Sequence, residues 1–229
     1  VMIDDEPTSW ASVYHDVTSH FNTSFGDKHG RSTNVHETAH DIHARERNKR
    51  FESVGKCNAF YCLNGRIVVL KDPKLTVRQI LVPSVLRSYR YKLYFEDQLV
   101  YWDEKPTYPL EEWSSYILGG ECAVEDHDMG LPAEKSDAVS GCLEFSIYSV
   151  ATAMAVKKLD SKYWDSEPNF KRFIRFNLGR AEKTFFKGRD TFKSERQESL
   201  LKTLRTHEDA TEIRNFMVKE FGEFFLADQ

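Results

Sequence analysis

The pattern of apolar and polar positions predicts a mainly helical chain with one central stretch of strands. Two segments have the spacing of amphipathic helices, at about residues 32–50 and about residues 110–127. Pro109 precedes the second of them and acidic residues fill its first turn, as is typical of a helix start. Further helices are expected in the last part of the chain, near residues 136–158, 168–187, 191–206 and 208–225.

The stretch between the first two helices changes to strand character. Apolar runs at residues 57–63 and 66–70 flank Asn64-Gly65, a dipeptide that strongly favours a hairpin turn. The rest of this stretch is expected to form a short helix and a second strand pair, at residues 75–86, 89–95 and 99–102. These elements together predict an α+β fold, in which a strand-rich insertion separates two helices.

Length and composition fit one large domain, or one domain with an appended subdomain. The chain has 229 residues, of which 40% are hydrophobic and 30% charged. We expect a core at residues 1–135 and a helical C-terminal subdomain at residues 136–229 that packs on it. No run of eighteen apolar residues occurs, so no membrane span is expected. The sequence begins at Val1-Met2 without a signal peptide, although a precursor can have carried one.

One motif in the first helix carries specific chemistry. Residues 36–40 read His36-Glu37-Thr38-Ala39-His40, which is the pattern HExxH. On a helix the spacing of four residues places both imidazoles on one face, close enough to bind one metal ion, and the glutamate between them can act as a base on water. Asn34 with Glu37 three residues later, or Ser32, can cap this helix. The alternative is an amphipathic helix whose histidines serve only packing.

A catalytic zinc ion usually has three protein ligands, so the motif needs one more His, Glu or Asp. His43 shares the face of the pair but lies about 10 Å along the axis from His36, so we interpret it as a packing or supporting residue. Asp41 and Glu46 are near in the chain. The favoured candidate is Glu121 in the second helix, where Glu125 follows four residues later on the same face.

This pair of segments resembles the gluzincin family of zinc peptidases, the thermolysin-like group. The resemblance covers about thirty residues and implies that Glu121 is the third zinc ligand and that Glu125 orients His36 or His40. The interval of about eighty residues between His40 and Glu121 is longer than in common gluzincins, so a strand-rich insertion has to fill it. Gly119 and Gly120 are expected to let the two helices pack closely. The resemblance also implies a zincin-like core.

Peptide hydrolysis further needs a hydrogen-bond donor for the negative charge that develops on the substrate oxygen. Tyr116 is the first choice because it lies one to two turns before Glu121 on the same predicted helix. Other candidates stay open: Tyr61, Tyr89, Tyr91, Tyr108, Tyr148, His127 and His207.

Charge and cysteine content change this picture little. The net charge is −4, yet residues 96–137 contain twelve acids and two lysines, whereas residues 167–206 contain eleven Lys or Arg and five acids. The basic block is interleaved with phenylalanines at helical spacing, which favours core packing over a nucleic-acid surface. Cys57 and Cys62 would lie about 17 Å apart in one extended strand, too far for a disulfide. Other pairings, free thiols and the compartment stay open, with export slightly favoured.

We therefore expect a zinc metalloendopeptidase of the HExxH type, in which His36, His40 and Glu121 bind Zn2+ and Glu37 activates water. The alternative is a catalytically inactive zincin-like domain that binds a protein or cell-wall partner. A nucleic-acid-binding helical protein is a third hypothesis. The expected partner is a protein or peptide substrate, with no nucleic acid and no membrane span, and the oligomeric state is open.

Overall fold

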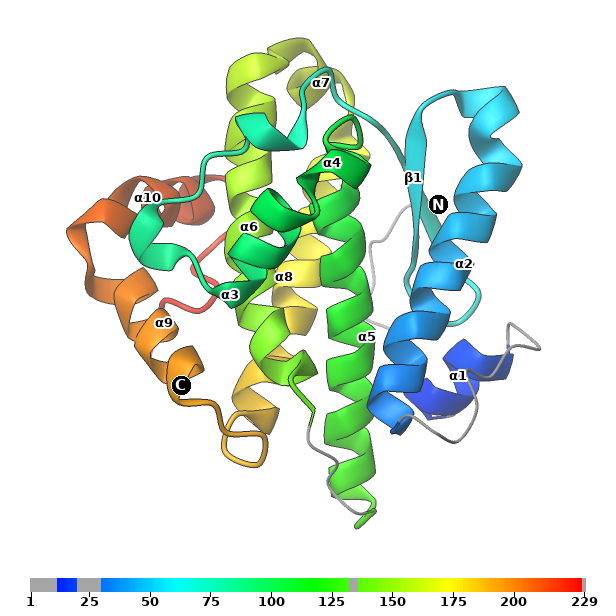
Figure 1. Cartoon of the computed structure of the whole chain (residues 1–229), viewed down its shortest axis with the longest axis vertical. Helices are drawn as coiled ribbons and strands as arrows, with labels where there is room; N and C mark the ends of the chain where they lie inside the picture. The colour runs from blue at the N-terminus through cyan, green and yellow to red at the C-terminus, as the bar shows by residue number, and fades with distance from the viewer. Residues whose placement is uncertain (1–11, 20–29, 132–135, 228–229) are drawn as a thin grey trace.

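Long helices dominate the fold of the chain, which a computed structural model describes over residues 12–19, 30–131 and 136–227 (Figure 1). The four longest are α2 (Arg31–Val54), α5 (Tyr108–Asp128), α6 (Ala138–Leu159) and α8 (Pro168–Gly188). The shorter ones are α1 (Val13–Ser19), α7 (Ser161–Ser166), α9 (Glu195–Thr206) and α10 (Thr211–Glu220), with a 3-10 turn η4 (Glu208–Ala210) before α10. The helices expected near the HExxH motif, near residues 110–127 and in the C-terminal part are thus confirmed.

Local sequence signals explain where the two helices of interest begin and end. Pro109 occupies the first turn of α5, where its missing N–H costs no hydrogen bond. Helix α2 begins at Arg31, directly after Gly30, which is its N-cap residue. The prediction that Ser32 or Asn34 caps this helix was therefore wrong. The helix ends at Gly55, whose φ of 82° lies in the left-handed region that a glycine adopts at low cost.

The predicted hairpin is present. Strand β1 (Cys57–Tyr61) pairs antiparallel with β2 (Ile67–Lys71), with Cys57 opposite Lys71 and Tyr61 opposite Ile67. Asn64 and Gly65 lie in the turn with φ of 50° and 68°, the left-handed conformation that this dipeptide favours. The hairpin packs along α2, with every residue of β1 buried.

The prediction of a second strand pair was wrong. Between β2 and α5 the chain forms short helical turns, η1 (Val77–Gln79), η2 (Ser84–Leu86), α3 (Tyr89–Tyr91), η3 (Lys92–Asp97, a π-helical turn) and α4 (Leu99–Trp102). The expected helix over residues 75–86 is likewise reduced to the two 3-10 turns η1 and η2. The aromatic residues of this segment favour strands by propensity, but no neighbouring strand exists among the described residues to pair with them. Instead, Tyr94 and Phe95 contact core residues of α6 from a helical conformation.

Helix α5 lies at the centre of the arrangement. It packs against α2 on one side and against α6 and α8 on the other, while α9 and α10 lie on the outer side of α6 (Figure 1). The segment between β2 and α5 crosses over α6 and returns to the start of α5 (Figure 1). One hydrophobic cluster extends from Phe60 in β1 to Phe225 near the C-terminus, so residues on both sides of the expected domain boundary pack together. The division into two parts stays a prediction.

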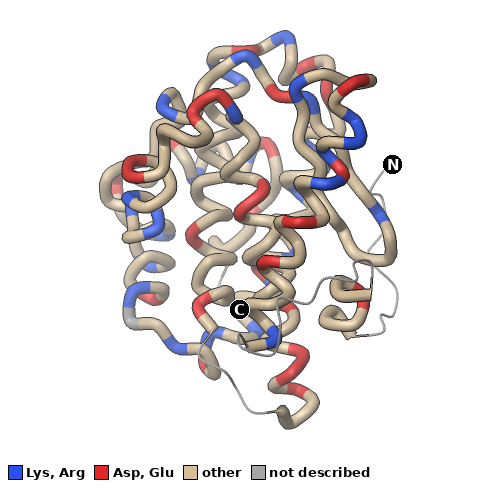
Figure 2. The backbone as a smooth tube through the Cα atoms, turned by 45° about the vertical axis from the view of Figure 1, so that its right-hand side comes forward, with Lys and Arg blue, Asp and Glu red and all other residues tan. Residues whose placement is uncertain are grey.

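Helix α6 is the most apolar of the four longest helices. It is long and apolar enough to span a membrane, but 94% of its most apolar window is buried inside the fold, and the core helix of a soluble protein meets the same criterion. Figure 2 shows acidic residues on the central helices as well as on the peripheral ones. Four phenylalanines of the basic block, Phe170, Phe173, Phe185 and Phe192, are buried, which confirms their expected role in core packing.

Candidate metal centre

The HExxH motif lies in the middle of α2, on the side that faces α5. The Nε2 atoms of His36 and His40 are 3.0 Å apart, as the spacing of one helical turn allows. Both side chains are mostly buried, with 13% and 23% of their surface exposed. The prediction that the two imidazoles converge is therefore confirmed by the structure.

The acidic residue that completes this pair comes from the first turns of α5. Glu112 Oε2 lies 3.5 Å from His40 Nε2 and 3.9 Å from His36 Nε2. The circle through the three atoms has a radius of about 2.0 Å, close to the length of Zn–N and Zn–O bonds. Glu112 Oε2 is buried and has no hydrogen-bond partner among the described residues, and such an atom is costly unless it binds something. His36, His40 and Glu112 could therefore hold one metal ion.

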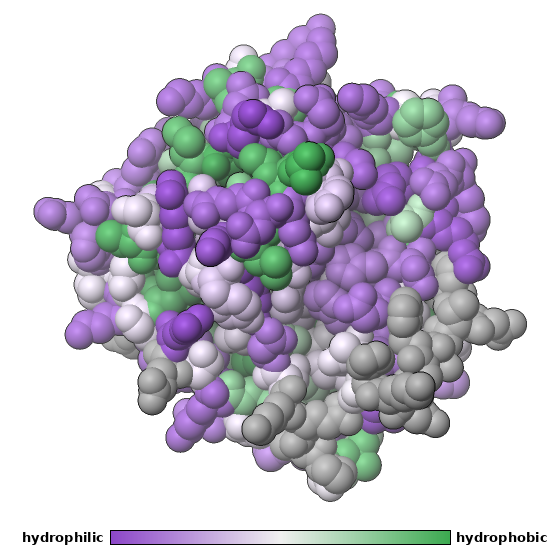
Figure 3. All heavy atoms as spheres, in the orientation of Figure 1, coloured by the Kyte–Doolittle hydropathy of each residue, from purple (hydrophilic) through white to green (hydrophobic). Residues whose placement is uncertain are grey.

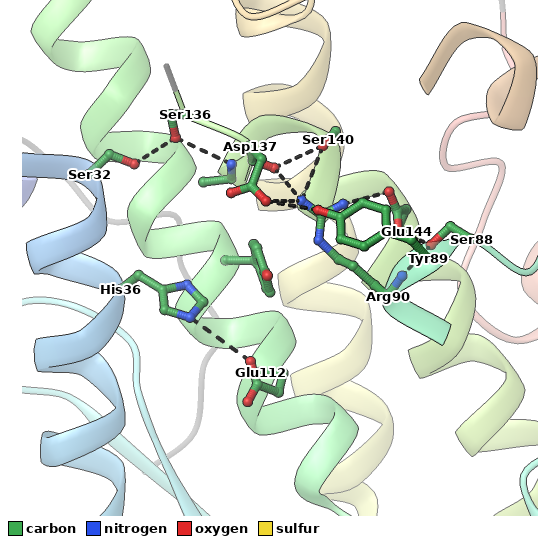
Figure 4. Close-up of polar contacts among 12 residues, drawn as sticks. Ser32, His36, Ser88, Tyr89, Arg90, Glu112, Ser136, Asp137, Ser140 and Glu144 are labelled. Carbon is green, nitrogen blue, oxygen red and sulfur yellow. Dashed lines mark hydrogen bonds and ion pairs between the residues drawn. The ribbon is translucent and has the colours of Figure 1, made fainter. Parts of the chain in front are cut away.

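Two hydrogen bonds aim these ligand atoms. The Tyr108 hydroxyl donates to Oε1 of Glu112. The other oxygen, Oε2, is directed to the histidines, and Figure 4 shows its contact with His36. His40 Nδ1 lies 2.8 Å from Glu111 Oε1, and because a carboxylate only accepts, Nδ1 carries the hydrogen. The lone pair of the neutral ring is then on Nε2, where a metal would bind it. Adjacent glutamates on α5 thus serve different functions at this centre.

His43 extends this chain of contacts on the same face of α2. Its Nδ1 lies 3.2 Å from the same Glu111 oxygen, while its ring is fully buried against Phe60 and its Nε2 has no partner among the described residues. The expectation that His43 supports the pair rather than joining it agrees with this placement, although His40, His43 and Glu111 also lie close enough together to form a second group of possible ligands.

Burial and charge shift the pKa values of the histidines in opposite directions. Burial, together with the charge of the neighbouring His40, lowers the pKa of His36 to about 4. Burial also opposes the charged form of His40, but the carboxylates of Glu111 and Glu112 outweigh it and raise its pKa well above the usual value. Burial would raise the pKa of Glu111, yet His40 and His43 hold it well below the usual range. Without a metal ion, His40 is the charged imidazole and His36 the neutral one.

A pocket of about 460 Å³ opens beside the three candidate ligands. Glu37 lies on its wall together with Tyr94, so the predicted base faces the same space as His36. Lys105 and Arg47 also line this pocket. The arrangement can admit a small molecule or an extended chain to the candidate metal centre.

Tyr116, the predicted donor, contacts this centre. Its ring lies with its centroid 4.6 Å from that of His36, in an edge-to-face arrangement, and stacks on Phe145. Its hydroxyl is 3.4 Å from that of Tyr94, which comes from the π-helical turn η3 and lines the metal pocket. Burial raises the pKa of both hydroxyls, so both stay protonated and able to donate. Tyr94 was not among the tyrosines that the sequence suggested.

The structure does not bring Glu121 to the histidine pair. Its carboxylate forms a two-point ion pair with Arg180 of α8, with distances of 2.9 and 2.6 Å. The physical reason is the helix geometry: Glu121 lies nine residues after Glu112, which is about 13 Å along the axis and half a turn around it. Glu125 is also elsewhere, since it accepts a hydrogen bond of 2.7 Å from the backbone N–H of Val13 at the start of α1.

The sequence contained a weaker signal for the acid that lies beside the histidine pair. Glu111 and Glu112 are consecutive in the first turns of α5, where acids are usually explained by the helix dipole. Only the depth of burial, with 3% of each residue exposed, separates them from ordinary surface acids. Comparisons with protein-family models, with curated proteins and with solved structures find no match for this chain.

Proposed function

We propose that this protein is a zinc-dependent hydrolase of peptide bonds. The observation that carries the proposal is the triangle of His36 Nε2, His40 Nε2 and Glu112 Oε2, an oxygen to which no described residue donates a hydrogen bond. Two imidazoles and one carboxylate are a common ligand set of catalytic zinc, and three ligands leave a position open. The pocket beside the triangle gives that position access to a substrate.

The donor set fits zinc better than harder cations. Mg2+ and Ca2+ prefer oxygen ligands, whereas two imidazole nitrogens and one carboxylate suit zinc or a related transition metal. The hydrogen bond from His40 Nδ1 to Glu111 belongs to the supporting contacts that metal-binding histidines usually make. When bound, zinc supplies a Lewis acid that lowers the pKa of water and polarises a carbonyl group.

The side chains around the triangle supply the other functions that hydrolysis needs. Glu37 lies on the pocket wall next to His36, so its carboxylate is placed to take a proton from the attacking water and pass it to the leaving nitrogen. Tyr94 and Tyr116 offer neighbouring hydroxyls, which can donate to the substrate oxygen as negative charge develops on it. Neither proton transfer nor donation requires a residue outside the described part of the chain.

Zinc content in two matched variants tests the ligand set. Glu112→Gln should weaken zinc binding by at least about a hundredfold, because it removes a charged ligand. Glu121→Gln, on the same helix, should bind one zinc per chain as the wild type does, and its amide oxygen can still accept from Arg180. Zinc would be measured in dialysed protein, with circular dichroism to verify folding. Retention in Glu112→Gln with loss in Glu121→Gln would refute the assignment.

Hydrolysis is tested with Glu37→Gln. This variant should keep its zinc and lose at least about a hundredfold in rate on a peptide library, because it lacks the base. Equal rates in the variant and the wild type would contradict the proposed role of Glu37. Zinc binding by a wild type that cleaves no peptide would instead favour a domain that binds a protein or cell-wall partner.

A further inference from the structure

A second, smaller hollow adjoins the candidate metal centre. Its volume is about 150 Å³, room for about five water molecules at ~30 Å³ each. It shares His36, Glu37 and Tyr94 with the larger pocket and extends to Asp137 at the start of α6. We call it the Asp137 pocket. A space of this size accommodates a side chain or the end of a peptide, and it lies directly beside the proposed reaction site.

The close approach of three helices builds one wall of the Asp137 pocket. A Cβ atom at Gly119 of α5 would lie 3.1 Å from the carbonyl oxygen of Ser32 and 3.4 Å from Cβ of His36, so only glycine allows this contact without a shift. The hydroxyl of Ser32 bonds to the Gly119 carbonyl at 2.9 Å and lies 2.8 Å from the hydroxyl of Ser136 (Figure 4). These buried contacts hold α2 and the start of α6 together around the pocket.

The charge of this pocket is set by a buried arginine. Arg90 is 1% exposed and donates from Nη1 to Glu144 at 2.6 Å, and Glu144 is itself buried. These two charges already compensate each other. Arg90 Nη2 donates at 2.7 Å to a second carboxylate, that of Asp137, which is 66% exposed (Figure 4). One guanidinium thus faces two carboxylates, and the surplus negative charge is on the exposed one.

The Oδ1 atom of Asp137 accepts no hydrogen bond from the described residues and can bind a ligand. Among the described residues, the hydrogen bonds to its carboxylate, from Arg90 and from Tyr89 at 2.9 Å, both end on Oδ2. The amino end of α6 attracts anions, but Asp137 is itself an anion at that position. Glu37 adds a second carboxylate to the pocket wall, and none of the described residues that line it is Lys or Arg.

The two sides of the candidate metal centre differ in whether cationic side chains are among the described residues that line them. The larger pocket combines Arg47 and Lys105 with four carboxylates. The described lining of the Asp137 pocket has the carboxylates of Glu37 and Asp137, hydroxyl groups and the His36 imidazole, and no Lys or Arg. We propose that the Asp137 pocket binds a cationic group of the peptide substrate, an α-ammonium group or a Lys or Arg side chain, within one or two residues of the scissile bond. This inference rests on the proposed function and names the substrate class that the same site accepts.

Matched peptide pairs test the preference in the zinc-loaded wild type. One pair differs only by acetylation of the N-terminus, and another by norleucine in place of lysine next to the scissile bond. The cationic member of at least one pair should be cleaved at least about tenfold faster in kcat/KM, as expected for a charge-assisted hydrogen bond. Loss of the preference on acetylation identifies the α-ammonium group, and loss with norleucine identifies the side chain. Equal rates in both pairs would overturn the inference and leave the proposed function intact.

Two variants place the preference at the pocket. Asp137→Asn keeps an acceptor for Arg90 and should reduce the preference to less than threefold, whereas Asp165→Asn, an exposed carboxylate on α7, should leave it unchanged. A preference that persists in a folded Asp137→Asn would overturn the inference. The substrate pairs remain decisive if that variant does not fold.

A binding experiment separates this inference from hydrolysis itself. Metal-free wild type keeps both carboxylates of the pocket but lacks the zinc that the proposed hydrolysis needs. It is mixed with an equimolar pool of the same peptides, and the captured peptides are quantified by mass spectrometry, while cleavage is measured with the zinc-loaded wild type. Enrichment of cationic members without any cleavage by the wild type would support the Asp137 pocket and refute peptide hydrolysis. Neither cleavage nor enrichment would refute both.

Discussion

Glu111 and Glu112 are neighbours in the chain but have separate functions at the candidate metal centre. Glu112 directs an oxygen to the Nε2 atoms of both histidines, whereas Glu111 receives hydrogen bonds from Nδ1 of His40 and of His43. The HExxH pair was predictable because its spacing matches one helical turn. The acid was not, since several glutamates of α5 satisfy the sequence criteria and only the rotation of α5 relative to α2 distinguishes them.

The support that Glu111 gives to His40 leads to a prediction at the level of one side chain. Glu111→Gln should weaken zinc binding by about 10- to 100-fold without abolishing it, because an amide accepts a weaker hydrogen bond from Nδ1. Glu104→Gln, an exposed acid before α5, should have no effect. Competition with a chelating dye measures both affinities. An unchanged affinity in Glu111→Gln would mean that the contact does not orient His40.

The opposite pKa shifts of His36 and His40 predict how zinc binding depends on pH. At neutral pH His40 is protonated, because its pKa is raised well above the usual value, and His36 is neutral, because its pKa is lowered to about 4. Binding must then expel one proton, so affinity should fall about tenfold for each pH unit between about 7 and 5. The dependence should steepen below about pH 4, where His36 also gains a proton.

Calorimetry in buffers of different ionisation enthalpy counts the released protons directly. The expected number near pH 7 is about one per zinc. Release of no proton would show that His40 is neutral in the metal-free protein, and release of two would show that both imidazoles are charged.

At the scale of elements, the segment before α5 shows why propensity misled the prediction. Tyr91, Phe95 and Trp102 favour strands, but Tyr91 and Phe95 also have helical spacing, and all three pack on the hydrophobic core. Tyr91 and Phe95 contact Tyr148 of α6. The hairpin after α2 was predictable because its signal is a local turn sequence, whereas this segment depends on tertiary contacts that a sequence does not display.

The packing of α5 on α6 predicts the effect of a single methyl group. A Cβ atom at Gly141 of α6 would lie 2.7 Å from Cγ of Tyr116 and nearer still to Cδ1, so Gly141→Ala must displace the ring that touches His36. We expect a loss of about 1–3 kcal/mol in the free energy of unfolding, from overpacking. Chemical denaturation of the folded protein measures it.

Gly179 provides the matched control for this substitution. It is also a helical glycine, but a Cβ there would meet only Cε1 of Phe224 at an ordinary 3.7 Å. Gly179→Ala should therefore be neutral or stabilise by up to about 1 kcal/mol through helix propensity. Equal effects of the two substitutions would show that the Tyr116 ring accommodates the methyl group freely.

At the scale of the whole molecule, the four cysteines do not reinforce the fold. Cys57, Cys62, Cys122 and Cys142 are buried and unpaired, and burial raises their pKa values, that of Cys62 to about 11. This answers the question that the sequence left open about their pairing. The thiols should be unreactive in the folded protein and react with reagents only when the core opens, so their reactivity reports unfolding.

Removal of zinc should lower the free energy of unfolding of the whole chain. Zinc in hundredfold excess over its dissociation constant should stabilise the fold by about 2.7 kcal/mol and raise the unfolding temperature by about 5–10 °C. Thiol reactivity should fall in parallel. Chelator-treated and zinc-loaded samples of wild type and Glu112→Gln give the comparison, and an equal gain in the variant would contradict binding at this centre.

The contact between α2 and α5 at the metal centre has a topological consequence. His40 and Glu112 are separated by about seventy residues of chain, which include the hairpin and the helical turns that follow it. An ion held by both would act as a cross-link that closes this loop. For a covalent link of that length, the chain-entropy relation gives about 4 kcal/mol of stabilisation, through restriction of the unfolded chain. In a protein without disulfides among its described cysteines, the reaction centre would then also be the molecule's internal tether.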